Sequence, residues 1–221
     1  MNSPSVKWRS SIQSVYSGLF PITTSGNERG IIMMANYKDL AAQFSRKVLG
    51  ADKPIPGFYD SDLEYFNFDA LWEENSIKDK VITGLNDFIS REVPELNKVT
   101  KILGTDTVTV NYSFGTLPVV SAVSHLLKKD LVIWSERGDL ARNAPKIFGK
   151  ISDNDEVLIV HDFLRETVIA KAIIDTLVAG SKCRIKAVVV LLNAANKKSL
   201  SEIGYTRIAY PVPIYSFISP V

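Results

Sequence analysis

Two side chains that can bind a ligand, His161 and Asp162, follow directly after the apolar run at residues 157–160. Four consecutive apolar residues are typical of a strand that is buried on both faces of a parallel sheet. Ligands of such sheets bind beyond the carboxyl ends of the strands. A carboxylate accepts hydrogen bonds from ligand hydroxyls, and an imidazole donates or accepts them. The sequence therefore predicts His161 and Asp162 as ligand-binding residues. For His161, a hydrogen-bonded residue at the end of a strand is the alternative.

The segment after Asp162, residues 163–168, precedes a stretch with helical spacing. The first backbone N–H groups of a helix and its dipole can bind a phosphate there. Arg165 offers a positive charge and Thr167 a hydroxyl donor, but the segment has no glycine to let the backbone approach a phosphate closely. Glu166 opposes binding, because two like charges about 4 Å apart repel by about 4 kcal/mol at an effective dielectric of about 20. Glu166 and Thr167 therefore have an alternative role as plain helix-start residues.

A second set of candidate ligand-binding residues is Ser113, Gly115 and Thr116, which follow a β-rich run at residues 107–112. Gly115 lets the backbone approach a ligand, and the hydroxyl groups of Ser113 and Thr116 can donate hydrogen bonds. If this run is a strand of the same parallel sheet, its end lies at the same edge as Asp162.

Arginines that can contact an anion lie in the polar stretch 135–146, which we predict to be a loop or a short irregular hairpin. Arg137 and Arg142 are the candidates. A stretch of mixed charge is often simply solvated, and this remains the alternative for both residues.

Hydrophobic spacing predicts the elements that must position these residues. A strand at 156–160, a helix at 167–178 and a strand at 185–192 form a βαβ unit, whose strands should be parallel and connected with a right hand. Further helices are predicted at 36–48, 77–89 and 119–127, and further strands at 107–112 and 131–134. Residues 1–30 are predicted to be an irregular arm and residues 31–221 one domain.

Composition limits the class of protein. The 221 residues are 46% hydrophobic and 23% charged, which is typical of a soluble domain with its own core. A net charge of +2 does not indicate a nucleic-acid or membrane partner. One cysteine and two histidines argue against disulfides and zinc. The longest apolar run, residues 187–192, is too short to cross a bilayer, so we expect a cytoplasmic protein.

The order of four segments resembles the type I phosphoribosyltransferases, and the orotate type in particular. Residues 157–168 resemble the motif that binds the phosphoribosyl donor, and residues 108–118 resemble the pyrophosphate loop. Residues 131–149 resemble a strand, a mobile loop and a returning hairpin, and residues 65–68 resemble the strand before the first core helix. The resemblance implies an α/β fold with an open parallel sheet flanked by helices and a small N-terminal hood region. It also implies a homodimer, and Mg²⁺ as cofactor if the protein is an active enzyme.

The residues that hold the donor in this family are largely replaced. The resemblance implies two acidic residues for the ribose hydroxyls, one of which supports the positive charge of the transition state. Asp162 is retained as the candidate catalytic residue, whereas His161 replaces the other acid. Replacements in the two loops are Ser135, Glu136 and Asp139 at basic positions, and Tyr112 and Phe114 at small ones. We therefore expect that ordinary donor chemistry has been lost.

Three hypotheses for function follow. The preferred one is a catalytically degenerate phosphoribosyltransferase-like protein that binds a nucleotide, another phosphoribosyl-type ligand or a protein partner. The second is an active, divergent enzyme that transfers phosphoribosyl to a nucleobase. In that enzyme the contacts would be Asp162 to the ribose, Arg165 and Thr167 to the 5′-phosphate, and Arg137 or Arg142 to the pyrophosphate. The third is a structural subunit whose N-terminal arm docks on another chain.

Overall fold

The computed structural model describes residues 28–50, 53–60, 65–106, 116–139, 144–164, 167–203, 205 and 207–219. The chain divides into two compact units, Met1–Met33 and Met34–Val221, and everything described below belongs to the second. The predicted irregular arm, residues 1–30, lies outside the described residues except at its end, where helix α2 (Glu28–Leu49) begins.

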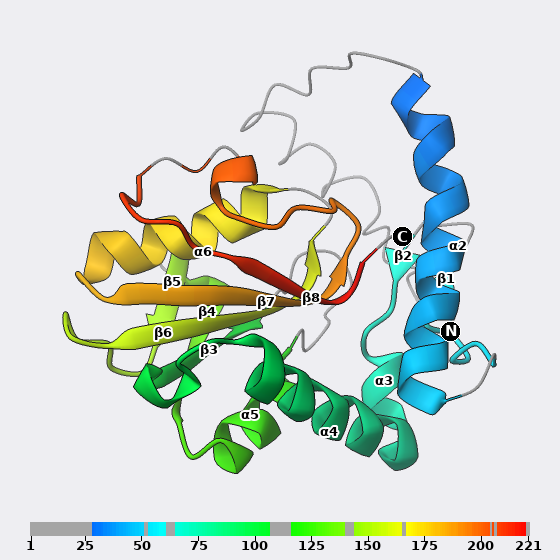
Figure 1. Ribbon diagram of the computed structural model, residues 1–221, viewed down its shortest axis with the longest axis horizontal. Helices are drawn as coiled ribbons and strands as arrows, with labels where there is room; N and C mark the ends of the chain where they lie inside the picture. Colours follow the sequence, from blue (N-terminus) through cyan, green and yellow to red (C-terminus); the bar gives the residue numbers. More distant parts are fainter. Residues whose placement is uncertain are drawn as a thin grey trace, which may run out of the picture. The chain divides into compact units, whose positions relative to one another are not determined.

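The larger sheet has six strands in the order β5-β4-β3-β6-β7-β8 (Figure 1). Its strands are β3 (Lys101–Asp106), β4 (Asp130–Asp139), β5 (Ala144–Phe148), β6 (Glu156–Leu164), β7 (Arg184–Asn193) and β8 (Ile214–Ile218). The edge strand β5 pairs antiparallel with β4, and the other pairings described for this sheet are parallel. The predicted open parallel sheet is therefore confirmed, with one antiparallel strand added at its edge.

The predicted βαβ unit is present as β6, helix α6 (Thr167–Gly180) and β7. The two strands are parallel, and Val160 pairs with Val189. Every residue of β6 from Val157 to Asp162 is buried. The apolar run that predicted burial on both faces is thus covered on both faces.

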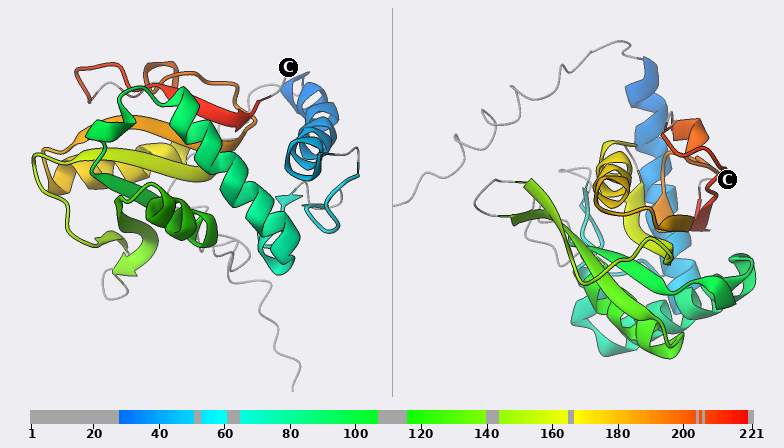
Figure 2. Two further views of the ribbon diagram at one scale, coloured as in Figure 1. Left: turned by 60° about the horizontal axis from the view of Figure 1, so that its bottom comes forward. Right: turned by 90° about the vertical axis from the view of Figure 1, so that its left-hand side faces the viewer.

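Helices cover the two faces of the sheet (Figure 2). The other helices of this unit are α3 (Ala70–Glu73), α4 (Asn75–Glu92) and α5 (Leu117–Leu126). On one face Leu85 of α4 and Val120 of α5 share a core with Leu158. On the opposite face Ile174 of α6 shares a second core with Ile159. Neighbouring residues of β6 thus enter different cores, and burial of each such side chain stabilises the fold by about 1.5–3 kcal/mol.

A small N-terminal region matches the predicted hood. It contains a two-stranded antiparallel sheet of β1 (Tyr59–Asp60) and β2 (Tyr65–Phe66). The ring centroid of Phe44 in α2 lies 5.0 Å from that of Phe58 and 6.2 Å from that of Phe217 in β8. Aromatic contacts therefore join this region to the far edge strand of the larger sheet.

Within the described ranges, no helix is long and apolar enough to cross a membrane.

A strand that the sequence did not indicate precedes the second set of candidate residues. This strand is β3 at Lys101–Asp106, whereas the predicted run 107–112 lies outside the described residues. Only Ile102 and Leu103 are strongly apolar before Gly104, so the hydrophobic pattern was too short to indicate a strand.

The polar stretch 135–146 belongs to a hairpin rather than to a loop. Strand β4 continues to Asp139, and β5 begins at Ala144. The register between the two strands shifts between Ser135 and Asp139, so the hairpin is irregular, as one of the two predictions for this stretch proposed.

Gly104 allows helix α5 to lie close against β3. A Cβ atom at this position would lie 3.1 Å from Val120 Cγ1 and 3.3 Å from Val120 Cβ. Both distances are shorter than ordinary van der Waals contact, so any larger residue must displace Val120 or the helix. Gly104 interrupts the apolar pattern that would predict a strand, but its lack of a side chain determines how closely α5 packs on β3.

We predict that Gly104→Val lowers the free energy of unfolding by about 1–3 kcal/mol, the usual cost of overpacking a core. Urea unfolding measures the change. Adding Val120→Ala should recover part of the loss, because the smaller side chain reopens the space. The control is Gly180→Ala, where an added Cβ meets nothing within 4 Å and should not destabilise. A Gly104→Val protein as stable as the wild type would contradict this packing.

Candidate functional site

The candidate site lies where the chain connections leave the sheet in opposite directions. The connection after β3 runs through α5 to β4 on one side, and the connection after β6 runs through α6 to β7 on the other. Because β3 and β6 are neighbours, their carboxyl ends form the kind of switch point at which open α/β sheets bind ligands. The polar residues at these two ends are Thr105 and Asp106 on β3, and His161 and Asp162 on β6.

Thr116, the residue before α5, connects the two strand ends through its hydroxyl group. Its Oγ1 accepts a hydrogen bond from the backbone N–H of Thr105 at 2.8 Å. The same atom lies 3.2 Å from the carbonyl oxygen of Thr105 and 3.3 Å from that of Val160. Threonine before a helix usually caps the first helical N–H groups, but this hydroxyl makes no such bond. It bonds instead to the sheet, which fixes the start of α5 against the ends of β3 and β6.

His161 is turned into this buried network, with only 2% of its surface exposed. Its Nδ1 lies 3.2 Å from Thr105 Oγ1 and 3.3 Å from Asp162 Oδ1. Burial lowers the pKa of His161 below its ordinary value, and the nearby Asp162 carboxylate raises it only in part. The imidazole is therefore neutral at pH 7.

Asp162 is held beside His161 at the end of β6. Its carboxylate Oδ1 accepts a hydrogen bond from the backbone N–H of Phe163 at 2.7 Å, and 7% of the residue is exposed. Phe163 in turn contacts Phe66 of strand β2, with 5.2 Å between the ring centroids. The carboxylate thus lies between the sheet edge and the aromatic residues of the N-terminal region.

A second acidic residue at this edge was missed by the sequence analysis. Asp106 Oδ2 accepts a hydrogen bond from Ser135 Oγ at 3.1 Å, across the ends of β3 and β4. The sequence does contain a signal for Asp106. Thr105 and Asp106 come after residues 102–104 of β3, much as His161 and Asp162 come after the longer apolar run of β6. Because residues 101–106 were not predicted to be a strand, the sequence did not show that Asp106 lies at this edge of the sheet.

The structure brings together three of the candidate residues, Thr116, His161 and Asp162. Thr167 is the first residue of α6 and Arg137 lies in β4, but the side chains of both are outside what the structure describes. The candidates that lie wholly outside the described residues are Ser113, Gly115, Arg142, Arg165 and Glu166.

The described side chains do not form a metal site of their own. No group of three or more His, Cys, Asp or Glu side chains that could hold a metal ion occurs in the described ranges. Mg²⁺ prefers oxygen ligands and often takes several of them from substrate phosphates. Asp162 could supply one such oxygen, while His161, which replaces a carboxylate, supplies none.

We predict that His161 makes stability depend on pH between about 7 and 5. In the unfolded chain the imidazole takes up a proton near its ordinary pKa of about 6.5, while the buried ring stays neutral. The stabilising contribution of His161 is therefore present above that pH and is lost as the pH falls, by up to about 1.4 kcal/mol per pH unit. Urea unfolding of the wild type and of His161→Gln at several pH values should show their difference changing in this direction.

His125→Gln is the matched control, because His125 is exposed on α5. Its free energy of unfolding at pH 7 should stay close to that of the wild type, as expected for an exposed side chain. A constant difference between wild type and His161→Gln from pH 7 to pH 5 would show that the ring is not held neutral.

Comparison with known proteins gives a match in structure alone. No family model matches the chain, and no curated protein matches its sequence. Adenine phosphoribosyltransferase from Saccharomyces cerevisiae is similar with a TM-score of 0.54 and 16% identity, over 79% of this chain and 98% of that chain. The adenine enzyme from Trypanosoma brucei gives a TM-score of 0.53 and 14% identity, over 81% and 79%.

Orotate phosphoribosyltransferase from Aeropyrum pernix is also among the similar structures, with a TM-score of 0.47 and 16% identity, over 70% of this chain and 78% of that chain. The orotate type remains a prediction, since this TM-score does not distinguish it. The fold itself, which the order of motifs predicted, is confirmed: the chain has the fold of the type I phosphoribosyltransferases.

Proposed function

We propose that this protein is a phosphoribosyltransferase-like nucleotide-binding protein that no longer catalyses transfer from the phosphoribosyl donor. The observation that carries the proposal is the burial of an imidazole, His161, beside Asp162 at the carboxyl end of β6. In the family that the sequence resembles, a pair of carboxylates occupies these two positions.

Binding of a ribose is supported by the position of Asp162. The residue lies at the carboxyl ends of the neighbouring strands β3 and β6, the place where sheets of this kind bind nucleotides. A carboxylate is an acceptor that suits the hydroxyls of a ribose. The aromatic ring of Phe163 next to it offers an apolar surface for the rest of the ligand.

Loss of transfer chemistry is supported by the charge at the site. Breaking the bond to pyrophosphate would leave positive charge on the ribose, and carboxylates stabilise that charge in the transition state. A neutral imidazole in place of one carboxylate removes a full negative charge, and His161 is directed toward Thr105 in the interior. The absence of glycine between residues 163 and 168, together with Glu166, further weakens binding of the donor phosphates.

As the resemblance implies, we expect the ligand-binding form to be a homodimer. Light scattering after size exclusion tests this expectation separately from ligand binding.

We predict that AMP or UMP binds the full chain in isothermal titration calorimetry and that Asp162→Asn weakens this binding at least tenfold, about 1.4 kcal/mol. The lost charge-assisted hydrogen bonds to the ribose hydroxyls are the physical reason. Asp87→Asn, on the exposed side of α4, is the matched control and should bind as the wild type does.

The same protein should release no pyrophosphate from phosphoribosyl pyrophosphate with Mg²⁺ and either adenine or orotate. Pyrophosphate release that depends on Asp162 would overturn the proposal and identify an active enzyme. If neither nucleotide nor the donor binds, the nucleotide-binding function is wrong.

A further inference from the structure

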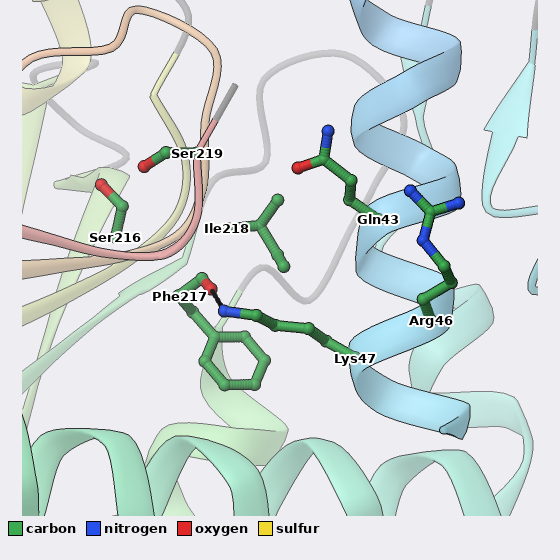
Figure 3. Close-up of a pocket in the computed structure, with 7 residues that line it drawn as sticks. All are labelled: Gln43, Arg46, Lys47, Ser216, Phe217, Ile218 and Ser219. Atoms are coloured by element: carbon green, nitrogen blue, oxygen red, sulfur yellow. Dashed lines mark hydrogen bonds between the residues drawn. The ribbon is translucent and has the colours of Figure 1, made fainter. Parts of the chain in front are cut away.

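A hollow lies between the last turns of α2 and strand β8, away from Asp162. It has a volume of about 500 Å³ and is lined by Gln43, Arg46 and Lys47 of α2 and by residues 216–219. Figure 3 shows Gln43 and Lys47 pointing from the helix toward β8, while Arg46 extends along the helix. The volume is in the range of pockets that hold small organic ligands, and larger than a bare inorganic ion needs.

The hollow is lined by hydrogen-bond donors. The Lys47 ammonium donates to the Phe217 carbonyl oxygen at 2.9 Å and lies 5.5 Å from the centroid of the Phe217 ring. An ammonium has three donor hydrogens, so this bond leaves two for a ligand. The Gln43 side-chain amide, which points toward β8, is a second donor on the helix side, whereas the hydroxyls of Ser216 and Ser219 point away from Lys47 (Figure 3).

The charge of the lining is positive. Among the described residues that line the hollow, two are basic and none carries a carboxylate. The two basic residues also offset the negative end of the α2 dipole, and that role keeps them at this end of the helix. A positive hollow with several donors is complementary to a phosphate group, which lysine binds as a point charge.

The floor of the hollow is apolar and firmly held. Phe217 is 7% exposed and contacts the rings of Phe44 and Phe88. A Cβ at Gly84 of α4 would lie only 3.1 Å from Phe217 Cζ, so the ring fits against a bare turn of that helix. The position of the Phe217 carbonyl, and with it that of Lys47, is thereby fixed, and Phe217 and Ile218 offer apolar surface to an organic group.

The hollow is distinct from the candidate nucleotide site. Strand β7 separates β8 from β6, and neighbouring strands lie about 4.8 Å apart, so the two sites are roughly 10 Å apart along the sheet edge. Asn193, at the end of β7, donates from Nδ2 to Ser216 Oγ at 2.8 Å. This bond holds one wall of the hollow in place without involving Asp162.

We propose that the hollow between α2 and β8 is a second binding site, for the phosphate group of a phosphate monoester with an apolar or aromatic body. Lys47 binds the phosphate, and Phe217 with Ile218 contacts the organic group.

Titration of the ¹⁵N-labelled full chain with phenyl phosphate tests this site, with the backbone amides of residues 216–219 as the readout. We expect saturable shifts at these amides and weaker binding of inorganic phosphate, which lacks the organic group. Lys47→Gln should weaken binding at least about tenfold, while Lys47→Arg, which keeps the charge, should stay within about threefold of the wild type.

Lys78→Gln removes one positive charge from α4 outside the hollow and should bind as the wild type does. Asp162→Asn should also leave this binding unchanged, which separates the site from the proposed nucleotide site. The proposal is overturned if residues 216–219 do not shift, if Lys47→Gln and Lys78→Gln weaken binding equally, or if inorganic phosphate binds as tightly as phenyl phosphate. Retention of wild-type affinity by Lys47→Gln would overturn it as well, and Lys47→Arg shows whether the fold tolerates change at this position.

Discussion

The hydroxyl group of Thr116 is the interaction on which the geometry of the candidate site depends. It bonds to the backbone of Thr105 on β3 and to the carbonyl of Val160 on β6, the two strands whose ends carry the candidate residues. Leaving such a buried group without a partner costs about 1–3 kcal/mol, so these bonds hold the strand ends and the start of α5 in one arrangement. Gly104 completes this constraint, because its missing side chain lets α5 approach the sheet at that point.

This network also determines the charge of the site. It encloses His161, and burial there favours the neutral ring, so the strand end carries one carboxylate where the related motif carries two. The same replacement that removes a catalytic charge supplies a hydrogen-bonding partner for Thr105. The proposed function, binding without bond cleavage, accounts for both features. The positive hollow beside β8 has the opposite charge, which suits a phosphate rather than a ribose.

The sequence predicted the centre of the fold better than its edges. A buried strand was predicted from the apolar run 157–160 and a helix from the spacing of 167–178. Both patterns are clear in the sequence. Strand β3 escaped prediction because its glycine serves the packing of α5 and breaks the pattern. His161 and Asp162 were predicted because they directly follow the apolar run of β6. Thr105 and Asp106 were not, because they lie at the end of β3, which the sequence did not indicate. The hollow at Lys47 could not be predicted, since it joins residues 170 positions apart through a helix and an edge strand.

The protonation state of His161 tests the central claim most directly, and NMR of the imidazole nitrogens measures it. The chain has only two histidines, so His125→Gln assigns the signals without ambiguity. The account predicts a neutral ring at pH 7 that resists protonation at least to pH values below about 6.5, the ordinary pKa. An imidazolium at pH 7, paired with Asp162 as an ion pair, would contradict it, because the site would then hold a positive charge where the proposed function requires none.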